Sequence, residues 1–184
     1  MANALLMVDI QRDYFSGGRM EVEGALKAAE GAKQLLEHFR RRGEMVIHIR
    51  HLSTRPGATF FLPGTEGTEI HESVLPLPGE PELEKNLPNS FVGTGLDAML
   101  KAGGADRLVI CGMMTHMCID TTVRAAFDLG YQVLLPHDAT ATRALAFGDM
   151  KIPAAQVQGA FMSALGAVFA RVLDVEEVIK LLKD

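Results

Sequence analysis

The sequence predicts an α/β fold, a doubly wound parallel sheet with helices on both faces. The main observation is that short apolar runs of strand length alternate with longer amphipathic segments along the chain. The second is size and composition: 184 residues, 48% of them hydrophobic and 22% charged, are enough to bury one substantial core. We therefore predict that residues 1–184 form a single domain.

The elements follow one another in a regular order. An apolar run over residues 4–10 predicts the first buried strand. Residues 24–42 carry alanine, leucine and phenylalanine at helical spacing and end in three arginines, which the helix dipole favours at a C-terminus. Further strands are predicted at residues 44–50, 107–111, 132–135 and 168–172, and further helices at 96–102, 119–129, 155–165 and 175–182.

A long segment rich in glycine and proline, residues 53–94, follows the second predicted strand. Loops of this length inside compact domains are usually functional or disordered. This one contains Phe60, Phe61 and Phe91, which make it too apolar for a free linker. We predict that it forms a lid or a wall of a ligand pocket.

The charge balance argues against several classes of protein. A net charge of −5 argues against a nucleic-acid partner, which would need a basic face. No apolar run approaches the roughly 20 residues that span a bilayer, so no membrane partner is predicted. The two cysteines, Cys111 and Cys118, do not make a disulfide framework, and the N-terminus lacks a basic region and a cleavage site. We predict a cytoplasmic location.

Residues at strand ends are the first candidates for functional residues, because ligands bind beyond the carboxyl ends of the strands in open α/β sheets. Asp9 interrupts the first apolar run, and a carboxylate is rarely buried without a partner. Asp9 is therefore a candidate functional residue; the alternative interpretation is that its carboxylate caps a loop. Lys85, next to Glu84, has the pattern of a solvated surface charge when spacing alone is considered.

The two cysteines occupy different contexts. Cys111 lies inside an apolar strand and is most simply an inert core thiol. Cys118 follows a glycine turn at the start of a predicted helix, where the dipole and nearby cations lower a thiol pKa and backbone N–H groups are free. One interpretation is that Cys118 is a nucleophile, and the other is that it is a structural cysteine.

Three motifs occur in order along the chain: Asp9-Ile10-Gln11-Arg12-Asp13-Tyr14-Phe15, then Lys85 with Ser90-Phe91, and Gly112-Met113-Met114-Thr115-His116-Met117-Cys118. In this order they resemble the motifs of the isochorismatase-like cysteine hydrolases, and the resemblance covers nearly the whole chain. It implies a Rossmann-like, three-layer sandwich with a six-stranded parallel sheet. It also implies a triad of Asp9, Lys85 and Cys118, and a cis peptide at Met113–Met114 that aims the N–H groups of Met114 and Cys118 into one oxyanion hole.

The reaction predicted from this resemblance is hydrolysis of a small amide or carbamoyl C–N bond through a thioester. Asp9 takes the proton of Cys118, and Lys85 stabilises the thiolate. The partner is a small-molecule substrate, no cofactor is required, and a homo-oligomer (dimer or tetramer) is expected because such assemblies are common in the family. The candidate pocket residues are Phe15, His51, Phe60, Phe91, Thr115 and His116.

No metal site is predicted. Nicotinamidases of this superfamily hold a metal through an Asp/His cluster after the second strand. Here that position carries His48 and His51 without the Asp-x-His pattern. Residues three apart in an extended strand point to opposite faces, so these two histidines are not expected to share an ion.

Two other functions remain open from the sequence. An isochorismatase-type vinyl ether hydrolase would not need the cysteine nucleophile. A binding or redox-sensing module could use Cys118 as a reactive thiol, but it would not need Asp9 and Lys85 as well. Their joint presence favours catalysis.

Overall fold

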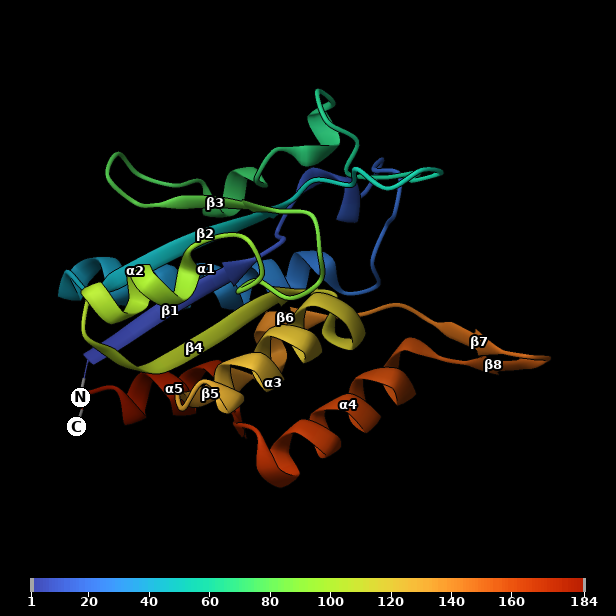
Figure 1. Ribbon diagram of the computed structural model, residues 1–184. Helices are drawn as coiled ribbons and strands as arrows, with labels where there is room; N and C mark the ends of the chain where they lie inside the picture. Colours follow the sequence, from blue (N-terminus) through green and yellow to red (C-terminus); the bar gives the residue numbers. More distant parts are fainter. Residues whose placement is uncertain (1, 184) are drawn as a thin grey trace.

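The computed structural model describes residues 2–183 and is built on one central sheet (Figure 1). Six strands follow the order β3-β2-β1-β4-β5-β9, all paired in parallel, and a short strand, β6, pairs with β4. This order confirms the predicted doubly wound α/β fold. The strands are β1 (Ala2–Val8), β2 (Met45–His51), β3 (Glu82–Lys85), β4 (Ala105–Met113), β5 (Gln132–Pro136), β6 (Thr140–Ala141) and β9 (Arg171–Leu173).

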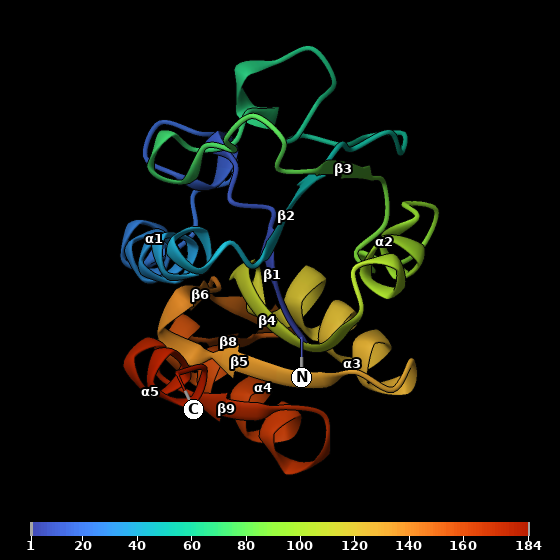
Figure 2. The ribbon, with the colours of Figure 1, turned by 90° about the vertical axis from the view of Figure 1, so that its left-hand side faces the viewer.

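Helices cover both faces of this sheet, because each central strand is apolar on both sides. Leu5 and Met7 of β1 pack into a cluster with α1 (Ala25–Arg42) and α5 (Val175–Leu181). Leu6, one residue along, points into the opposite cluster. Figure 2 shows α1 and α5 on one side of the sheet and α2 and α3 on the other. The helices contributing to the second cluster are α2 (Leu96–Ala102), α3 (Asp120–Asp128) and α4 (Ala154–Val168).

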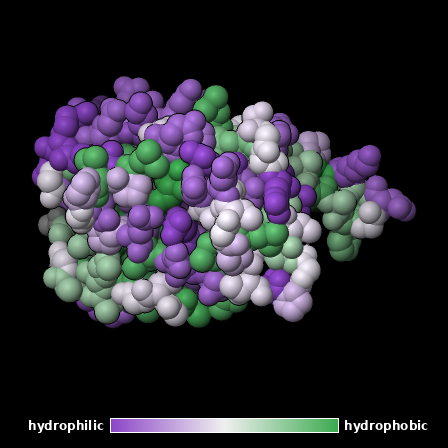
Figure 3. Space-filling model, turned by 90° about the horizontal axis from the view of Figure 1, so that it is seen from above, coloured by the Kyte–Doolittle hydropathy of each residue, from purple (hydrophilic) through white to green (hydrophobic). Residues whose placement is uncertain are grey.

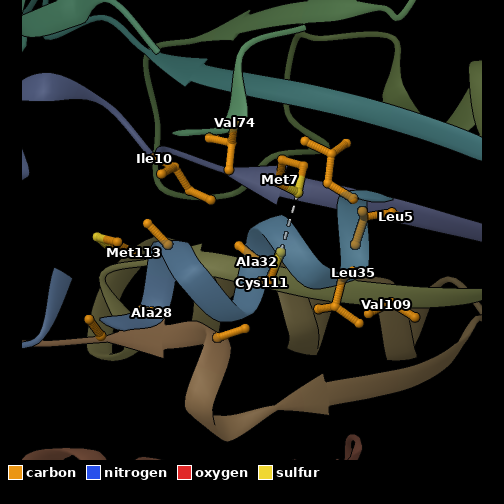
Figure 4. Close-up of a cluster of buried hydrophobic side chains, with 14 of the residues drawn as sticks. Leu5, Met7, Ile10, Ala28, Ala32, Leu35, Val74, Val109, Cys111 and Met113 are labelled. Atoms are coloured by element: carbon orange, nitrogen blue, oxygen red, sulfur yellow. Dashed lines mark hydrogen bonds between the residues drawn. The ribbon is translucent and has the colours of Figure 1, made fainter. Parts of the chain in front are cut away.

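Cys111 belongs to the cluster under α1. Its side chain is fully buried, and Figure 4 shows it beside Met7 and close to Ala32 and Leu35. The Cys111 Sγ lies 3.5 Å from the Met7 Sδ, and burial raises the pKa of the thiol well above its usual range. Cys111 is therefore a packing residue, whose thiol donates a long hydrogen bond to the Leu6 carbonyl at 3.7 Å, a contact that does not activate it.

Three differences between the structure and the predicted elements are the largest. Strand β3 lies inside residues 53–94, where only a loop was expected, because it is a charged edge strand without an apolar run. The last strand begins at Arg171 rather than residue 168, because α4 continues to Val168. A hairpin of β7 (Leu145–Phe147) and β8 (Met150–Ile152) was not predicted; it projects from the body of the molecule at the right of Figures 1 and 3.

Gly112 sits where β4 passes closest to β1. Its φ of 122° is unfavourable for any side chain, and a Cβ there would collide with the carbonyl oxygen of Val8. We expect Gly112→Ala to lower the free energy of unfolding by about 3 kcal/mol or more, measured by urea denaturation. Gly159→Ala is the matched control, because its Cβ would meet open space on α4. It should leave stability unchanged or raise it, and equal losses in both variants would contradict the expectation.

No helix within residues 2–183 is long and apolar enough to cross a membrane.

Candidate active site

Four neighbouring strand ends bring the site together. Asp9 follows the last residue of β1, His51 ends β2 and Lys85 ends β3. Strand β4 leads through Met114 into one wide helical turn, η4 (Thr115–Ile119), which carries Cys118. Strands β1 and β4 are adjacent at the point where the strand order reverses, and this switch point is where doubly wound sheets bind ligands.

The backbone at Asp9 adopts a left-handed conformation with φ of 52°. For a residue other than glycine this conformation costs of order 1 kcal/mol or more, and it persists where surrounding contacts fix it. Here the Asp9 N–H donates to the Ile49 carbonyl at 2.9 Å, and the residue is fully buried. Such strain is concentrated at functional sites.

Lys85 is the centre of the cluster. Its Nζ lies 2.8 Å from Asp9 Oδ2, 3.2 Å from Cys118 Sγ and 3.0 Å from His51 Nδ1. The Leu87 carbonyl accepts from the same nitrogen at 3.2 Å. The side chains of Lys85 and Asp9 are both 0% exposed, so the two charges form a buried ion pair. The structure thus brings together all three members of the triad predicted from the resemblance.

The charge state of Lys85 follows from its neighbours. Burial alone would lower its pKa, but the Asp9 carboxylate and the nearby Cys118 raise it by more, so that the pKa lies above its usual value. Lys85 is therefore an ammonium group at neutral pH. It has three protons and four acceptors within hydrogen-bonding distance.

Cys118 is held as a neutral thiol, contrary to the depressed pKa expected from its position at a helix start. Its residue is only 6% exposed, and burial raises the pKa well above the usual range. The Asp9 carboxylate raises it further, and Lys85 opposes both effects without overcoming them. Because the thiol is not ionised at rest, it would have to lose its proton to a neighbour before it could act as a nucleophile. Asp9 Oδ1 is buried and has no hydrogen-bond partner among residues 2–183, so this oxygen is free to accept a proton.

Asp9, His51 and Cys118 also form a possible metal-binding trio, since one ligand atom of each lies within 4.8 Å of the others. The Lys85 Nζ is within hydrogen-bonding distance of one such atom from each residue. An ion bound to all three would have to displace this ammonium group, and it would place a second cation beside Lys85. The three side chains therefore suit the Lys85 ammonium group, which already lies between them, better than a metal ion.

A cavity of about 180 Å³ opens on Cys118. Its walls are mainly aromatic and apolar, and a few polar side chains interrupt them. Much of the lining comes from residues 53–94, the segment expected to form a lid or a wall. The lining residues are Tyr14, His51, Ser53, Arg55, Phe60, Phe61, Asn86, Leu87, Pro88, Met114, Met117 and Cys118.

Two of the six candidate pocket residues, His51 and Phe60, line this cavity. Phe15 does not, because its ring stacks on His71 at 3.7 Å between centroids. The preceding residue, Tyr14, takes its place. Burial raises the pKa of the Tyr14 hydroxyl, and the nearby Cys118 and Asp9 raise it further.

The other three candidates lie outside the cavity. Phe91 stacks on Tyr131, with 6.1 Å between ring centroids, in the cluster on the opposite face of the sheet. Thr115 is fully buried, and His116 is hydrogen-bonded to Thr142 at 2.6 Å. Both belong to the turn that carries Cys118, but neither lines the cavity.

Arg55 and Asn86 are polar lining residues that the sequence did not indicate. Arg55 lies in a loop with no periodicity. Asn86 follows Lys85 directly, and its side-chain amide donates to the Leu52 carbonyl at 2.9 Å. Asn86 could have been predicted as a site residue only if β3 had been predicted as a strand, because Asn86 directly follows the end of that strand.

The peptide bond between Met113 and Met114 is cis. Met114, which immediately precedes the turn, and Cys118, its fourth residue, both line the cavity. The first N–H groups of a helical turn have no partner within the turn, so these two positions can offer donors to a ligand.

The fold and the cluster at its switch point define an α/β enzyme with a buried cysteine. A family model described as the isochorismatase domain matches residues 3–177. The chain therefore belongs to the isochorismatase family, and it is a hydrolase.

Individual relatives agree with this assignment. The isochorismatase family protein YddQ of Bacillus subtilis is 48% identical over 180 residues, which are 98% of this chain and 100% of YddQ. A streptothricin hydrolase of Streptomyces noursei is 39% identical over 89% of this chain and 59% of its own length.

Two solved structures have the same fold. An isochorismatase hydrolase from Oleispira antarctica superimposes with a TM-score of 0.93 and 46% identity, covering 97% of this chain and 96% of the other. The N-carbamoylsarcosine amidase from Thermoplasma acidophilum gives a TM-score of 0.80 and 27% identity, covering 95% and 97%.

Proposed function

We propose that this hydrolase cleaves a C–N bond of a small amide or carbamoyl compound through a thioester on Cys118. One observation carries the proposal: Lys85 Nζ lies within hydrogen-bonding distance of both Asp9 Oδ2 and Cys118 Sγ, and Cys118 lines the cavity. A base, a cation and a nucleophile thus meet beside a space for a small substrate. That one structural relative is by name an amidase supports the choice of bond.

In the first half of the reaction, Asp9 takes the proton of the Cys118 thiol and the sulfur attacks the substrate carbonyl. Lys85 balances the negative charge, which moves from the carboxylate to the sulfur and then to the oxygen. The N–H groups of Met114 and Cys118 bind that oxygen; one such donor is worth about 2.7–4 kcal/mol. The C–N bond then breaks, and the leaving nitrogen takes the proton from Asp9.

In the second half, water hydrolyses the thioester. Asp9 takes a proton from the attacking water, the C–S bond breaks, and the proton returns to the sulfur. The enzyme is restored with a neutral thiol and an ionised carboxylate. No step calls for a cofactor.

The raised thiol pKa weighs against the redox-sensing alternative. Sensor cysteines combine a low pKa with exposure, because the thiolate is the form that reacts with oxidants. Cys118 has the opposite properties, since it is buried and its pKa is raised. A thiol that is protonated at rest, and that loses its proton to a neighbouring base only during the reaction, is suited to catalysis.

The test is a panel of small primary amides, ureides and N-carbamoyl compounds, assayed for ammonia release and quenched in acid for mass spectrometry of the intact protein. We expect turnover of at least one compound, together with an acyl adduct that peptide mapping locates on Cys118. An isochorismate-like vinyl ether is included in the panel. Turnover of that compound alone, with no adduct, would contradict the proposed chemistry.

We also propose that the protein acts in the cytoplasm as a homo-oligomer, a dimer or a tetramer. Both cysteines are unpaired, which suits a reducing compartment. On the projecting hairpin, Phe147 is 80% exposed and Met150 is 62% exposed, which suits a contact with a second chain. Analytical ultracentrifugation measures the assembly directly, and a monomer at micromolar concentration would contradict it.

A further inference from the structure

We propose that His51 is a positioning residue that, as a neutral imidazole, accepts a hydrogen bond from the Lys85 ammonium group through Nδ1. In doing so it holds Lys85 between Asp9 and Cys118. The inference rests on the proposed function for its catalytic consequence. Its geometry, however, stands independently on the contacts of His51.

The placement of His51 opposite Lys85 is fixed by strand pairing. In the parallel register of β2 with β3, His51 is the partner of Lys85. The two side chains therefore leave the sheet edge at neighbouring positions, and Nδ1 lies 3.0 Å from Nζ. The same ring lines the cavity beside Cys118.

The side chain of Gln11 also fixes the backbone of His51, in addition to the strand pairing. Gln11 is fully buried, and its Oε1 accepts from the His51 N–H at 2.8 Å. Its Nε2 donates to the His51 carbonyl at 3.0 Å and to the Thr68 carbonyl at 2.9 Å. The end of β2 is thus tied to the residues that follow β1, and the imidazole has little freedom to leave Lys85.

The proton count on Lys85 gives Nδ1 its role. A buried ammonium group needs an acceptor for each of its three protons. Asp9 and Cys118 take two. The third is left for His51 at 3.0 Å or the Leu87 carbonyl at 3.2 Å. An imidazole can accept only if Nδ1 carries no proton, so the resting tautomer has its proton on Nε2.

The environment keeps this imidazole neutral. Burial lowers the His51 pKa, Lys85 lowers it further, Asp9 raises it, and Arg55 lowers it again, for a net fall below 6.5. Cys118 also faces the ring and is itself neutral at rest. Protonation at Nδ1 would remove the acceptor and put a second cation beside Lys85. Lys85 would then turn towards the Leu87 carbonyl and away from the reacting atoms.

Three variants test this role. His51→Asn places an amide oxygen near the position of Nδ1 and should retain most of the wild-type kcat. His51→Leu removes the acceptor and should lower kcat about 10²-fold, the cost of displacing a catalytic group by about 1 Å. His71→Asn is the matched control, because His71 stacks on Phe15 outside the cavity. Equal losses in the Asn and Leu variants would overturn the proposal.

The pH profile separates positioning from a merely structural role. In the wild type, activity should fall as the pH drops below 6.5 and His51 gains a proton. In His51→Asn this limb should move to lower pH, because an amide does not titrate. In His71→Asn it should stay where the wild type has it. An unchanged limb in His51→Asn would assign it to another group and overturn the role of His51.

A measurement without substrate keeps this inference distinct from the proposed function. In protein labelled with ¹⁵N-histidine, the ring shifts of His51, assigned through His51→Asn, report the tautomer and its titration. We expect a proton on Nε2 at pH 7, protonation only below pH 6.5, and a changed titration in Lys85→Met. A proton on Nδ1 at pH 7 would overturn the inference even if the enzyme hydrolyses amides. The expected tautomer in a protein that turns over no amide would count against the proposed function alone.

Discussion

Cys118→Ala is expected to lower kcat by about 10⁴-fold or more, because the proposed mechanism makes Cys118 the nucleophile, and losing the nucleophile of a catalytic triad removes nearly all of its rate enhancement. Substrate binding should change little, since the cavity walls are mostly other residues. Ammonia release from the best compound of the amide panel measures the effect. Cys118→Ser should be almost as inactive, because a hydroxyl is a far weaker acid than a thiol and Asp9 cannot readily take its proton.

The matched control is Cys111→Ala. Cys111 is the other buried thiol, but it packs under α1, where its sulfur lies beside the Leu6 carbonyl and Met7 Sδ. This variant should lose about 1 kcal/mol of stability and keep its kcat. Circular dichroism establishes that both variants are folded. Turnover retained in folded Cys118→Ala would exclude the thioester and favour the vinyl ether chemistry.

Lys85→Met is expected to lower the free energy of unfolding by about 3–5 kcal/mol as well as to abolish turnover. The reason is that it leaves the Asp9 carboxylate buried and without its cation, which is far costlier than losing the pair as a whole. Urea denaturation at pH 7 measures the loss. The double variant Asp9→Asn/Lys85→Met should regain much of the stability while staying inactive.

A surface pair provides the control for Lys85→Met. Lys101 pairs with Asp97 at 2.6 Å, but its side chain is 63% exposed. Lys101→Met should therefore cost less than about 1 kcal/mol. If Lys85→Met cost no more than Lys101→Met, the buried ion pair would not have the energetic role assigned to it here. The coupling energy between Asp9 and Lys85 follows from the cycle of single and double variants.

The parts of the site that sequence could predict are those that follow from strand periodicity. Asp9 and Cys118 come after apolar runs, and the rule for open α/β sheets places such residues together. Lys85 is different. It lies on β3, a short edge strand whose charged residues give no strand pattern, and its burial arises only from pairing with β2 and from the chain above it. From local sequence it is a surface lysine, and only the resemblance to a family indicated otherwise.

Two further differences have physical causes that local sequence does not contain. The helix start suggested a lowered pKa for Cys118, but residues 53–94 help to cover the thiol, and burial outweighs the nearby cation. Tyr14 rather than Phe15 lines the cavity, because the ring of Phe15 stacks on His71, a residue distant in sequence. Local sequence does not show which of two adjacent aromatic residues finds such a packing partner.

The neutral, buried state of Cys118 has a consequence for inhibitor chemistry. Alkylating agents and peroxide react with thiolates, so reagents that rely on pre-existing ionisation should modify this cysteine slowly. In the proposed mechanism, an electrophile that occupies the 180 Å³ cavity and presents a carbonyl or nitrile carbon to the sulfur would instead use Asp9 to remove the proton. Covalent inhibitors selective for this enzyme should therefore owe their potency to fit and base-assisted addition rather than to intrinsic reactivity, and should leave ordinary exposed thiols untouched.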